Sequence, residues 1–451
     1  MPDDGPLGPE VLTGWGGAVR SAGTLHHPTA ADVARRLGAA GPRGLIARGL
    51  GRSYGDPALN AGGDVLAPLP TAIGPLAGDG TVEVSAGTSL HDLVRFLLPR
   101  GRFVPVTPGT RYVTVGGALA CDVHGKSHHR SGSFGDQVVS VDLVLPDGTA
   151  RTVTPETDAE LYWATVGGMG LTGVITGARL RTVPVETAYL DTTTRRLGDL
   201  DAVLAEMVAS DDDYAYSVAW IDTDARGSSL GRAVLSRGDH ATRDQLSGRS
   251  AADPLAVPGP PRVTVPFVPP VGLVTRPAVR AFNELWFHKA PRLRTGELQT
   301  ISQFFHPLDG VAHWNRLYGP RGFVQYQLVV PEHRDDVVRS VLEQVSRDRH
   351  PTFLTVLKRF GPGNPGWLSF PTAGWTLALD FPARRDLAPM LDRFDEEVVA
   401  AGGRVYLAKD ARLRPELLPA MYPRLADFRE LRDRLDPERR LQSDLARRLS
   451  L

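Results

Sequence analysis

The sequence predicts an α+β protein with at least two domains. Short β-branched runs separated by glycine fill residues 1–187 and are typical of strands joined by tight turns. Amphipathic segments between these runs predict helices. From about residue 188 the pattern changes to longer helical segments and aromatic-rich strands. A chain of 451 residues, 42% apolar and 23% charged, is long enough for two or three domains with their own cores.

In the first region, strands are predicted at GLIARG, TVEVSAG, VVSVDLVLPDG and LTGVITGARL. The segment Ser89–Gly101 predicts a helix, because Ser89 is a favourable N-cap residue and Gly101 a favourable stop. A similar helix is predicted near residue 30, in TAADVARRLGAAG.

The second region predicts a sheet backed by helices. Helices are expected at LDAVLAEMVAS, HRDDVVRSVLEQVSRD and LAPMLDRFDEEVVAAGG, and strands at YAYSVAWIDT, GFVQYQLVVP and GWTLALDFP. After residue 404 the pattern changes again, to a short strand followed by charged helices.

Residues 254–277 are apolar and rich in proline, which blocks a regular helix. Two interpretations stay open for this segment. It is either an irregular surface loop or an apolar flap over a substrate channel or against a lipid surface.

The composition excludes several classes of function. Lys plus Arg and Asp plus Glu are 51 each, so the chain lacks the basic excess of a non-specific nucleic-acid binder. The single cysteine, Cys121, excludes an intrachain disulfide and a cysteine-rich zinc site. No run of 18 apolar residues predicts a membrane span, and the N-terminal MPDDGPLGPE lacks the apolar segment of a Sec signal peptide. These features favour a cytoplasmic protein.

The stretch from Gly44 to Gly63 nearly matches the dinucleotide fingerprint G-x-G-x-x-G, with Gly49, Gly51 and Gly55. The third glycine comes one residue late, however, and DPALNAGG follows it, which forms turns rather than a helix. We therefore expect a loop whose backbone N–H groups converge on an anion, instead of a helix N-terminus that binds it.

Two more glycine clusters follow, in residues 107–136 and 164–175. A glycine pair alone usually marks an ordinary turn. Three clusters beside β-branched runs predict a long cofactor held by backbone groups, because glycine lets a ligand approach the main chain closely.

The motifs ARGLGRSYGD, VTVGG, HGKSHH and GGMGLTG resemble the FAD-binding domain of the vanillyl-alcohol-oxidase family, the PCMH-type flavoproteins. The resemblance continues through QFFHPLD, WNRLYGP, GFVQYQ, GWTLALDFP, YLAKDAR and SDLARRLSL, and so covers nearly the whole chain. It implies a two-part FAD-binding domain, residues 1–187 and 404–451, and an inserted substrate-binding domain, residues 188–403, with an antiparallel sheet backed by helices. Relatives act at the cell envelope, so membrane association there is the alternative to a cytoplasmic location.

The resemblance also implies which residues contact FAD. Several relatives carry a flavin-linked histidine near the position of Tyr54, and its replacement by tyrosine implies non-covalent FAD. Cys121 is expected to be a small buried hydrophobe whose backbone faces the cofactor. The expected cofactor-binding residues are Ala47, Arg48, Gly49, Leu50, Gly51, Arg52, Ser53, Tyr54, Gly55, Asp56, Pro57, Gly109, Thr114, Val115, Gly116, Gly117, Cys121, Asp122, Val123, His124, Ile175 and Tyr406.

Oxidation of a secondary alcohol needs a hydride acceptor, a base for the hydroxyl proton and groups that bind the substrate. Lys409 is either a solvated lysine paired with Asp410 or, by the resemblance, a base or donor near the flavin. His124 is either a core histidine or a residue beside the flavin or sugar phosphate. Although HGKSHH has three histidines, no carboxylate or cysteine is suitably spaced, so no metal is expected.

The resemblance assigns catalytic roles to Lys409, His124 and Tyr54, and substrate contacts to Lys126, Trp220, Gln325, Gln327, Lys358, Thr376, Ala378 and Phe305. Without the resemblance, Trp220 is either a core residue or a pocket residue, and Lys358 is either an exposed surface lysine or a pocket residue. Relatives carry cysteine, asparagine, tyrosine and serine where this chain has Ala378, Thr376, Phe305 and Val218, which leaves the exact sugar open.

The implied reaction is FAD-dependent oxidation of the 2′-hydroxyl of decaprenylphosphoryl-β-D-ribose, or a similar polyprenyl-phosphate sugar, to the 2′-keto sugar. This is the first half of an epimerisation toward the arabinose donor of cell-wall arabinan. The implied partners are a separate NADH-dependent keto-reductase, quinone or oxygen as electron acceptor, and a peripheral membrane contact. Two alternatives are an alditol or aldonolactone oxidase of the same fold and a non-catalytic protein that binds a lipid-linked sugar.

Overall fold

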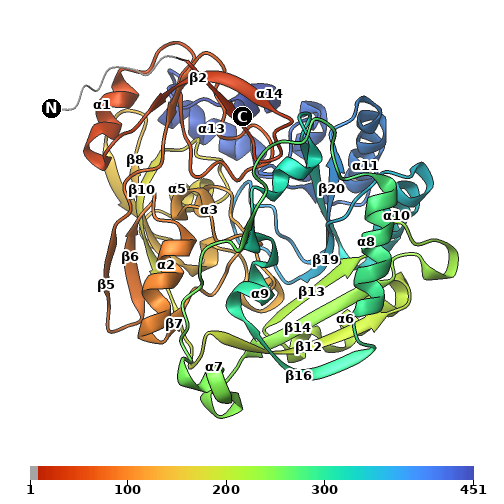
Figure 1. Ribbon diagram of the computed structural model, residues 1–451. Helices are drawn as coiled ribbons and strands as arrows, with labels where there is room; N and C mark the ends of the chain where they lie inside the picture. The colour runs from red at the N-terminus through yellow and green to blue at the C-terminus, as the bar shows by residue number, and fades with distance from the viewer. Residues whose placement is uncertain (1–8) are drawn as a thin grey trace.

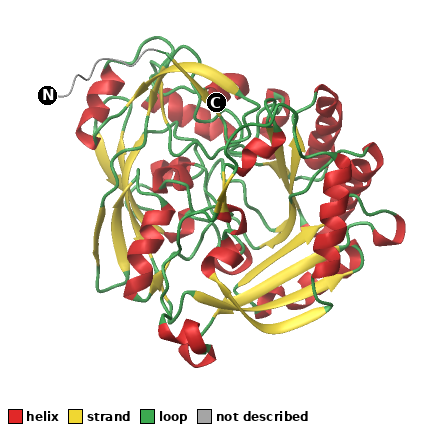
Figure 2. Ribbon diagram, in the orientation of Figure 1, coloured by secondary structure: helices red, strands yellow, loops and turns green. Residues whose placement is uncertain are grey.

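The computed structural model describes residues 9–451 and contains three main sheets (Figure 1). Loops occupy most of the region between the two larger sheets (Figure 2). The smallest of the three has the order β1-β2-β4-β3, in which β1 and β2 are antiparallel and β4 runs parallel to β2 and β3. Its strands are β1 (Glu10–Thr13), β2 (Arg20–His26), β3 (Leu45–Ala47) and β4 (Asp64–Leu66).

The second sheet is antiparallel and has the order β5-β6-β10-β8-β9. Its strands are β5 (Ile73–Leu76), β6 (Thr81–Ser85), β8 (Val138–Val144), β9 (Ala150–Val153) and β10 (Val174–Arg181), and the short β7 (Arg102–Phe103) and β11 (Val183–Pro184) pair separately. The helices of this region are α1 (Val33–Gly38), α2 (Leu90–Leu97), α3 (Val115–Ala120), α4 (His128–Ser131) and α5 (Ala159–Thr165).

The predicted boundaries of α2 are confirmed. The hydroxyl of Ser89 accepts the N–H of Asp92 at 3.0 Å, as an N-cap residue does. Gly101 ends the following 3₁₀ turn with a φ of +66°, a conformation that glycine adopts without steric cost.

The third sheet has the order β16-β12-β14-β13-β19-β20-β18-β21, and every pair in it is antiparallel. Its strands are β12 (Tyr189–Leu197), β13 (Tyr216–Ile221), β14 (Ala233–His240), β16 (Leu293–Thr300), β18 (Phe323–Val330), β19 (Thr355–Phe360), β20 (Gly374–Pro382) and β21 (Arg404–Val405). The helices α6 (Leu200–Ser210), α10 (Asp335–Asp348) and α11 (Ala388–Ala400) pack their apolar sides into one core with this sheet. The expected antiparallel sheet backed by helices is therefore present.

The last part of the chain returns to the first sheet. The helices α12 (Leu418–Met421), α13 (Leu425–Leu435) and α14 (Asp444–Leu449) follow β21, and Figure 1 shows α13 and α14 beside β2. The N–H of Leu45 donates to the carbonyl of Arg440 at 2.7 Å, and the N–H of Gln442 donates to Leu45 at 2.9 Å. The two ends of the chain thus form one unit, although β21 itself is still bonded to β18 of the third sheet.

The proline-rich segment 254–275, here called the strap, is largely irregular and crosses the side of the molecule that faces the viewer in Figure 1. It follows α7 (Gly248–Ala252), and its short strand β15 (Val263–Thr264) pairs with β17 (Val311–Ala312). It leads directly into α8 (Arg276–Lys289), a helix that the sequence pattern did not predict. Its buried residues Val279, Asn283 and Phe287 follow one side of the helix, but the apolar Leu285 and Trp286 are exposed, so apolar residues are not confined to the buried side.

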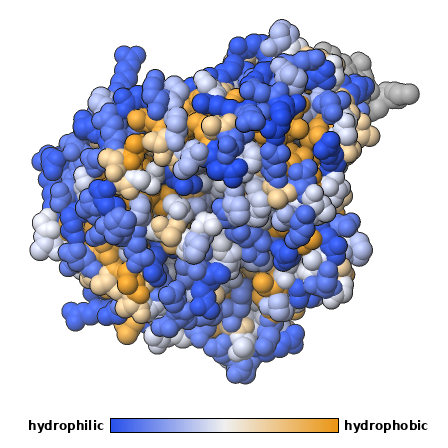
Figure 3. Space-filling model, turned by 180° about the vertical axis from the view of Figure 1, so that it is seen from behind, coloured by the Kyte–Doolittle hydropathy of each residue, from blue (hydrophilic) through white to orange (hydrophobic). Residues whose placement is uncertain are grey.

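Among residues 9–451, no helix combines the length and the apolar character that a membrane span requires. On the side opposite to that of Figure 1, most of the surface is hydrophilic, and several apolar areas lie between the hydrophilic residues (Figure 3).

Candidate active site

A cavity lies where the glycine loops of the first half meet β18, β19 and β20 and the turn after β21. About 1880 Å³ within it, including the part open to solvent, is free of protein atoms. Most predicted site residues line it: Ala47, Arg48, Gly49, Leu50, Gly51, Arg52, Ser53, Tyr54, Pro57, Gly109, Thr114, Gly116, Gly117, Cys121, Val123, His124, Ile175, Gln325, Gln327, Lys358, Ala378, Tyr406 and Lys409.

The first glycine loop presents a row of free backbone donors to the cavity. The N–H groups of Gly49 to Ser53 have no acceptor among residues 9–451. Gly51 has a φ of +65°, and a Cβ there would collide with the guanidinium of Arg48, which is held by the carbonyls of Thr13 and Ala58. Consecutive free amides in a turn bind anions, so this loop fits the diphosphate of FAD without a helix terminus.

The second loop adds a close backbone surface. The hydroxyl of Thr114 caps α3 by accepting the N–H of Gly117 at 3.1 Å. A Cβ on Gly116 would lie 2.9 Å from Ala86, which explains glycine there, whereas a Cβ on Gly109 would meet no atom within 4 Å. Gly109 therefore faces the open cavity.

Asp122 was expected to contact FAD but does not line the cavity. It is buried with a φ of +41°, and its carboxylate accepts the N–H of Gly135 at 2.8 Å and the hydroxyl of Ser133 at 2.7 Å. Asn364, from the second half of the chain, donates to the same carboxylate at 2.9 Å. Asp122 therefore fixes the turn that carries Cys121 and His124, a role that only the folded chain reveals.

Cys121 faces the cavity at the start of this turn. Its sulfur lies 3.9 Å from the hydroxyl of Ser53, and its carbonyl accepts the hydroxyl of Tyr406 at 2.7 Å. Burial raises the pKa of the thiol to about 11. The side chain is therefore an uncharged thiol at neutral pH.

The hydrogen bonds around His124 identify its tautomer. The hydroxyl of Thr376 donates to the carbonyl of Leu328 at 2.8 Å, so it accepts from the amide nitrogen of Gln327 at 3.2 Å. The same nitrogen donates to Nε2 of His124 at 2.9 Å, which leaves the ring proton on Nδ1. Burial, and next the nearby Lys358, lower the pKa of His124 well below its usual value. His124 is thus neutral, and its Nδ1–H has no partner among the described residues.

Lys409 lies at the same end of the cavity, with its ammonium 3.9 Å from the ring centre of Tyr54. Removal from water lowers the pKa of Lys409 and raises that of the nearby Asp380, because each group loses hydration in its charged form. The amide of Gln325 donates to one oxygen of Asp380, and the other oxygen has no partner among the described residues.

The alternative in which Lys409 pairs with Asp410 is wrong. The Asp410 carboxylate accepts the backbone N–H groups of Arg412 and Leu413 and the guanidinium of Arg448. Lys409 instead lines the cavity, and it forms no ion pair with Asp410.

Two further lysines lie near His124. Lys358, on β19, lines the cavity and is half-buried, so the interpretation as an exposed surface lysine is wrong. Removal from water lowers its pKa to about 8. Lys126 lies behind the lining, with its amine against the carbonyl and 4.3 Å from the ring centre of Phe304, and burial lowers its pKa to about 7. Among residues 9–451 neither lysine has a carboxylate oxygen within 4.0 Å.

Several expected site residues lie outside the lining: Gly55, Asp56, Val115, Asp122, Lys126, Trp220, Phe305 and Thr376. Trp220 donates its indole N–H to the carbonyl of Phe353 at 3.3 Å and packs beside Phe282. Phe305 is stacked on Phe103 in the core, with ring centres 5.5 Å apart. Thr376 orients Gln327 instead of facing the cavity.

The cavity wall also contains residues that were not among the predicted site residues, including Trp15, Thr110, Met169, Asp309 and Trp314. Met169, Asp309 and Trp314 lie within the motifs GGMGLTG, QFFHPLD and WNRLYGP that carried the resemblance. These motifs could therefore have indicated the three residues, but a motif alone does not show which of its side chains point into the cavity.

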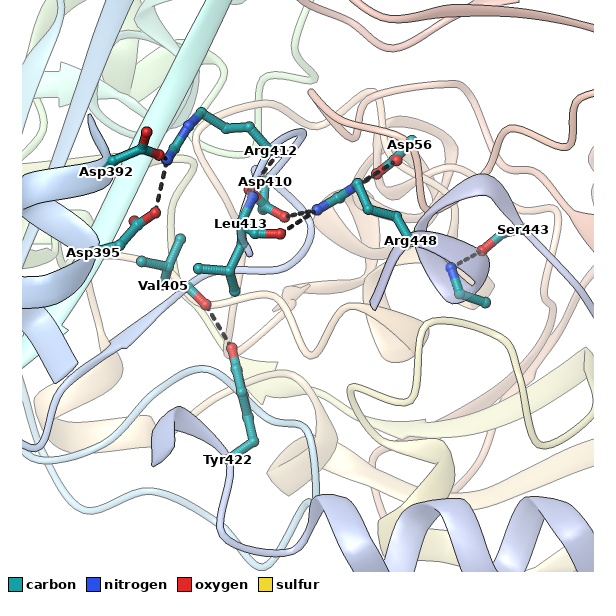
Figure 4. A network of polar contacts seen from close by, with 11 residues as sticks. Asp56, Asp392, Asp395, Val405, Asp410, Arg412, Leu413, Tyr422, Ser443 and Arg448 are labelled. Atoms are coloured by element: carbon teal, nitrogen blue, oxygen red, sulfur yellow. Dashed lines mark hydrogen bonds and ion pairs between the residues drawn. The ribbon is translucent and has the colours of Figure 1, made fainter. Parts of the chain in front are cut away.

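The C-terminal helix anchors the first loop and the Lys409 turn together (Figure 4). Arg448 of α14 pairs with Asp56 at 2.7 Å and with Asp410 at 2.8 Å. The N–H of Tyr54 donates to Ala408 at 3.0 Å, and a Cβ on Gly55 would overlap the carbonyl oxygen of Asp410. This contact places Tyr54 against Lys409.

Comparisons with known proteins agree with this site. Residues 26–154 match an FAD binding domain, and residues 332–449 match the D-arabinono-1,4-lactone oxidase family. The chain is 42% identical to decaprenylphosphoryl-beta-D-ribose oxidase of Mycolicibacterium smegmatis, over 99% of this chain and 98% of that protein. It is 44% identical to an uncharacterized protein of Streptomyces coelicolor, over 80% of this chain and 100% of that protein, and 26% identical to the alditol oxidase of a Streptomyces species, over 97% and 99%.

The residues matched by the FAD binding domain include the glycine loop with the free amides. The alignment with the first of these relatives includes all residues that line the cavity. The chain belongs to the family of FAD-linked oxidases that includes decaprenylphosphoryl-β-D-ribose oxidase, and it is an FAD-dependent oxidoreductase of α+β fold.

Proposed function

We propose that the protein oxidises the 2′-hydroxyl of decaprenylphosphoryl-β-D-ribose, or of a similar polyprenyl-phosphate sugar, to the 2′-keto sugar. One observation carries this substrate class. Lys358 faces the cavity without a carboxylate oxygen within 4.0 Å among residues 9–451, and its pKa of about 8 leaves it charged at pH 7. A desolvated cation without a partner favours an anionic ligand, as a sugar phosphodiester is and a neutral polyol is not.

Residues 1–187 and 404–451 form the FAD-binding domain in this proposal, and residues 188–403 the substrate-binding domain. The amides of Gly49–Ser53 hold the diphosphate. The loop Thr114–Gly117, the turn Cys121–His124 and Tyr406 lie along the rest of the cofactor. FAD supplies the acceptor for the hydride that leaves the sugar carbon.

Lys409 is the proposed base for the hydroxyl proton. Removal from water favours its neutral amine, which has a lone pair for this proton. Neutral His124 donates its Nδ1–H to a sugar oxygen and does not act as the base, because Gln327 occupies its Nε2. Tyr54 positions the side chain of Lys409 through its ring.

The keto sugar is half of an epimerisation, so a separate NADH-dependent reductase is the proposed partner toward the arabinose donor of cell-wall arabinan. Quinone or oxygen is the proposed electron acceptor. An alditol or aldonolactone oxidase is the second candidate, favoured by the match of residues 332–449 to a lactone oxidase family. The non-catalytic alternative is set aside because the chain belongs to an oxidase family.

Anaerobic flavin bleaching tests the substrate class directly. The FAD-loaded protein is mixed with polyprenyl-phosphoryl ribose, the matching ribose glycoside without phosphate, alditols and aldonolactones. Loss of flavin absorbance with the phosphoryl sugar alone is expected. Faster bleaching with an alditol or lactone would favour the second candidate, and no bleaching with the phosphoryl sugar would refute the first.

The flavin is expected to be bound without a covalent link, because Tyr54 replaces the histidine that anchors it in several relatives. Trichloroacetic acid should therefore release the yellow colour into the supernatant. A pellet that stays yellow after washing would contradict this prediction and direct attention to Cys121 and His124, which also line the cavity.

The KM for the phosphoryl sugar is expected to rise about tenfold between pH 7 and pH 9. The pKa of Lys358 is lowered to about 8, so its positive charge is present below this pH and is lost above it. A hydrogen bond to a charged group is worth ~1.5–3 kcal/mol, and ~1.4 kcal/mol corresponds to tenfold. Steady-state kinetics should show a flat KM in Lys358→Arg, which keeps its charge. A KM that rises equally in this variant would exclude Lys358 as the phosphate ligand.

A further inference from the structure

Exposed apolar side chains are concentrated in one part of the chain. Of the thirteen large apolar residues exposed among residues 9–451, ten lie between Val257 and Leu293. Val271, Leu285 and Phe267 are the most exposed of these, at 73%, 69% and 66%. Here the apolar face means Val263, Phe267, Val268, Val271 and Leu273 of the strap and Phe282, Leu285 and Trp286 of α8. A soluble surface rarely gathers apolar side chains in this way unless the patch contacts something.

The apolar face is continuous with the wall of the cavity. Trp314 lines the cavity, and its ring centre lies 6.5 Å from that of Phe353. Phe353 is 5.6 Å from Phe282, and Phe282 is stacked 5.9 Å from Trp286 on the surface of α8. On the strap side, Val274 packs into the same aromatic cluster as Trp314. An unbroken row of aromatic rings therefore joins the cavity wall to the exposed face.

The charge around this face is positive. Residues 254–294 contain six Arg or Lys residues and one Glu, although the whole chain has no net charge. Asp224 lies near Arg276 and Arg280, and Glu297 pairs with Arg294, so a basic excess of three remains when both acids are included. Apolar side chains surrounded by Arg and Lys match the two components of an anionic bilayer, its acyl chains and its headgroups.

We propose that the apolar face docks onto the surface of an anionic phospholipid bilayer. The side chains of the strap and of α8 enter the headgroup region, and Arg262, Lys289 and Arg292 lie against lipid phosphates. A second copy of the chain is a poorer occupant, because a symmetric contact would bring two copies of the same basic patch into one interface. One consequence rests on the proposed function: the sugar of a lipid-linked substrate would enter the cavity directly from the membrane.

Vesicle flotation tests the docking without any sugar substrate, so its outcome is independent of the proposed function. The FAD-loaded protein is mixed with vesicles of phosphatidylcholine alone or with phosphatidylglycerol added. The protein is expected to float with the anionic vesicles, and raised salt should weaken this binding. Equal recovery with both vesicle types, or none with either, would refute the proposal.

The triple variant Phe267→Gln/Val271→Gln/Leu285→Gln is expected to bind anionic vesicles at least about tenfold more weakly. The control is Val11→Gln, which changes a side chain of the same exposure as Leu285, 69%, on β1. Flavin absorbance verifies that both variants are folded. Sedimentation velocity in the absence of vesicles detects self-association. A wild-type dimer that the triple variant abolishes, without vesicle binding, would assign the face to a second copy and overturn the proposal.

A label on the face provides a measurement that does not depend on the triple variant. Val271→Cys carries an environment-sensitive dye, and wild-type protein treated with the same dye measures any labelling of the natural Cys121, which lines the cavity and is partly exposed. Anionic vesicles should shift the emission of the Val271 label to shorter wavelength and leave a label at Val11→Cys unchanged. No shift at Val271, or equal shifts at both positions, would contradict docking through this face.

Discussion

Replacement of Lys409 by methionine is expected to slow anaerobic flavin reduction by about 10²–10⁴-fold, the usual contribution of a positioned base. Methionine keeps most of the volume of the side chain but has no group that accepts a proton. Stopped-flow absorbance at saturating phosphoryl sugar measures the effect. Bound FAD should be unchanged, because Lys409 lies at the sugar end of the cavity in this proposal and not along the amide row.

Two further variants separate the base from a simple positive charge. Lys409→Arg restores the charge but does not deprotonate near neutral pH, so it should stay as slow as Lys409→Met. Arg339→Met removes an exposed cation that pairs with Asp201 on the surface, and it should reduce flavin at the wild-type rate. A fast Lys409→Arg variant would show that charge suffices and would refute the role of Lys409 as base.

Replacement of Arg448 by methionine is expected to lower the free energy of unfolding by ~3–5 kcal/mol, the usual cost of removing one partner from a buried ion pair. The change leaves both Asp56 and Asp410 without their cation, and these carboxylates are only 7% and 3% exposed. Urea denaturation followed by tryptophan fluorescence measures the loss. FAD should also dissociate more readily, because Asp56 belongs to the loop with the free amides.

The matched control is Arg434→Met. Arg434 also pairs with two acidic residues, Glu160 and Glu430, but all three side chains are about half exposed or more. Surface pairs of this kind contribute ~0–1 kcal/mol, so this variant should remain close to wild type. If Arg448→Met were equally mild, the anchoring of the two loops by α14 would be wrong.

Local backbone chemistry explains what the sequence predicted well. Ser89 begins α2 and Gly101 ends the 3₁₀ turn that follows it, because each satisfies a requirement within one turn of its own position. The turn residues after Gly55 excluded a helix, and the structure has a loop there. The alternation in β18 placed Gln325 and Gln327 on one side, and both line the cavity.

Residues whose roles depend on distant partners were not predictable in this way. Asp122 looked like a cofactor contact but binds Ser133 and Asn364, and Asn364 is 242 positions away. Phe305 belongs to the motif QFFHPLD and Trp220 was an expected substrate contact, but neighbouring rings from other strands and helices hold both outside the cavity lining. The motif that contains a residue does not determine the direction of its side chain.

The sequence by itself determined the α+β class, the positions of the glycine loops, the family and hence the FAD, because each depends on short-range patterns. Only the tertiary structure decided which polar groups lose water and partners. It brings Lys409, Asp380 and Tyr54 together, leaves the ring proton of His124 on Nδ1, and exposes the apolar residues of α8 and the strap. Desolvation depends on everything that surrounds a group in space, and no local pattern in the chain encodes it.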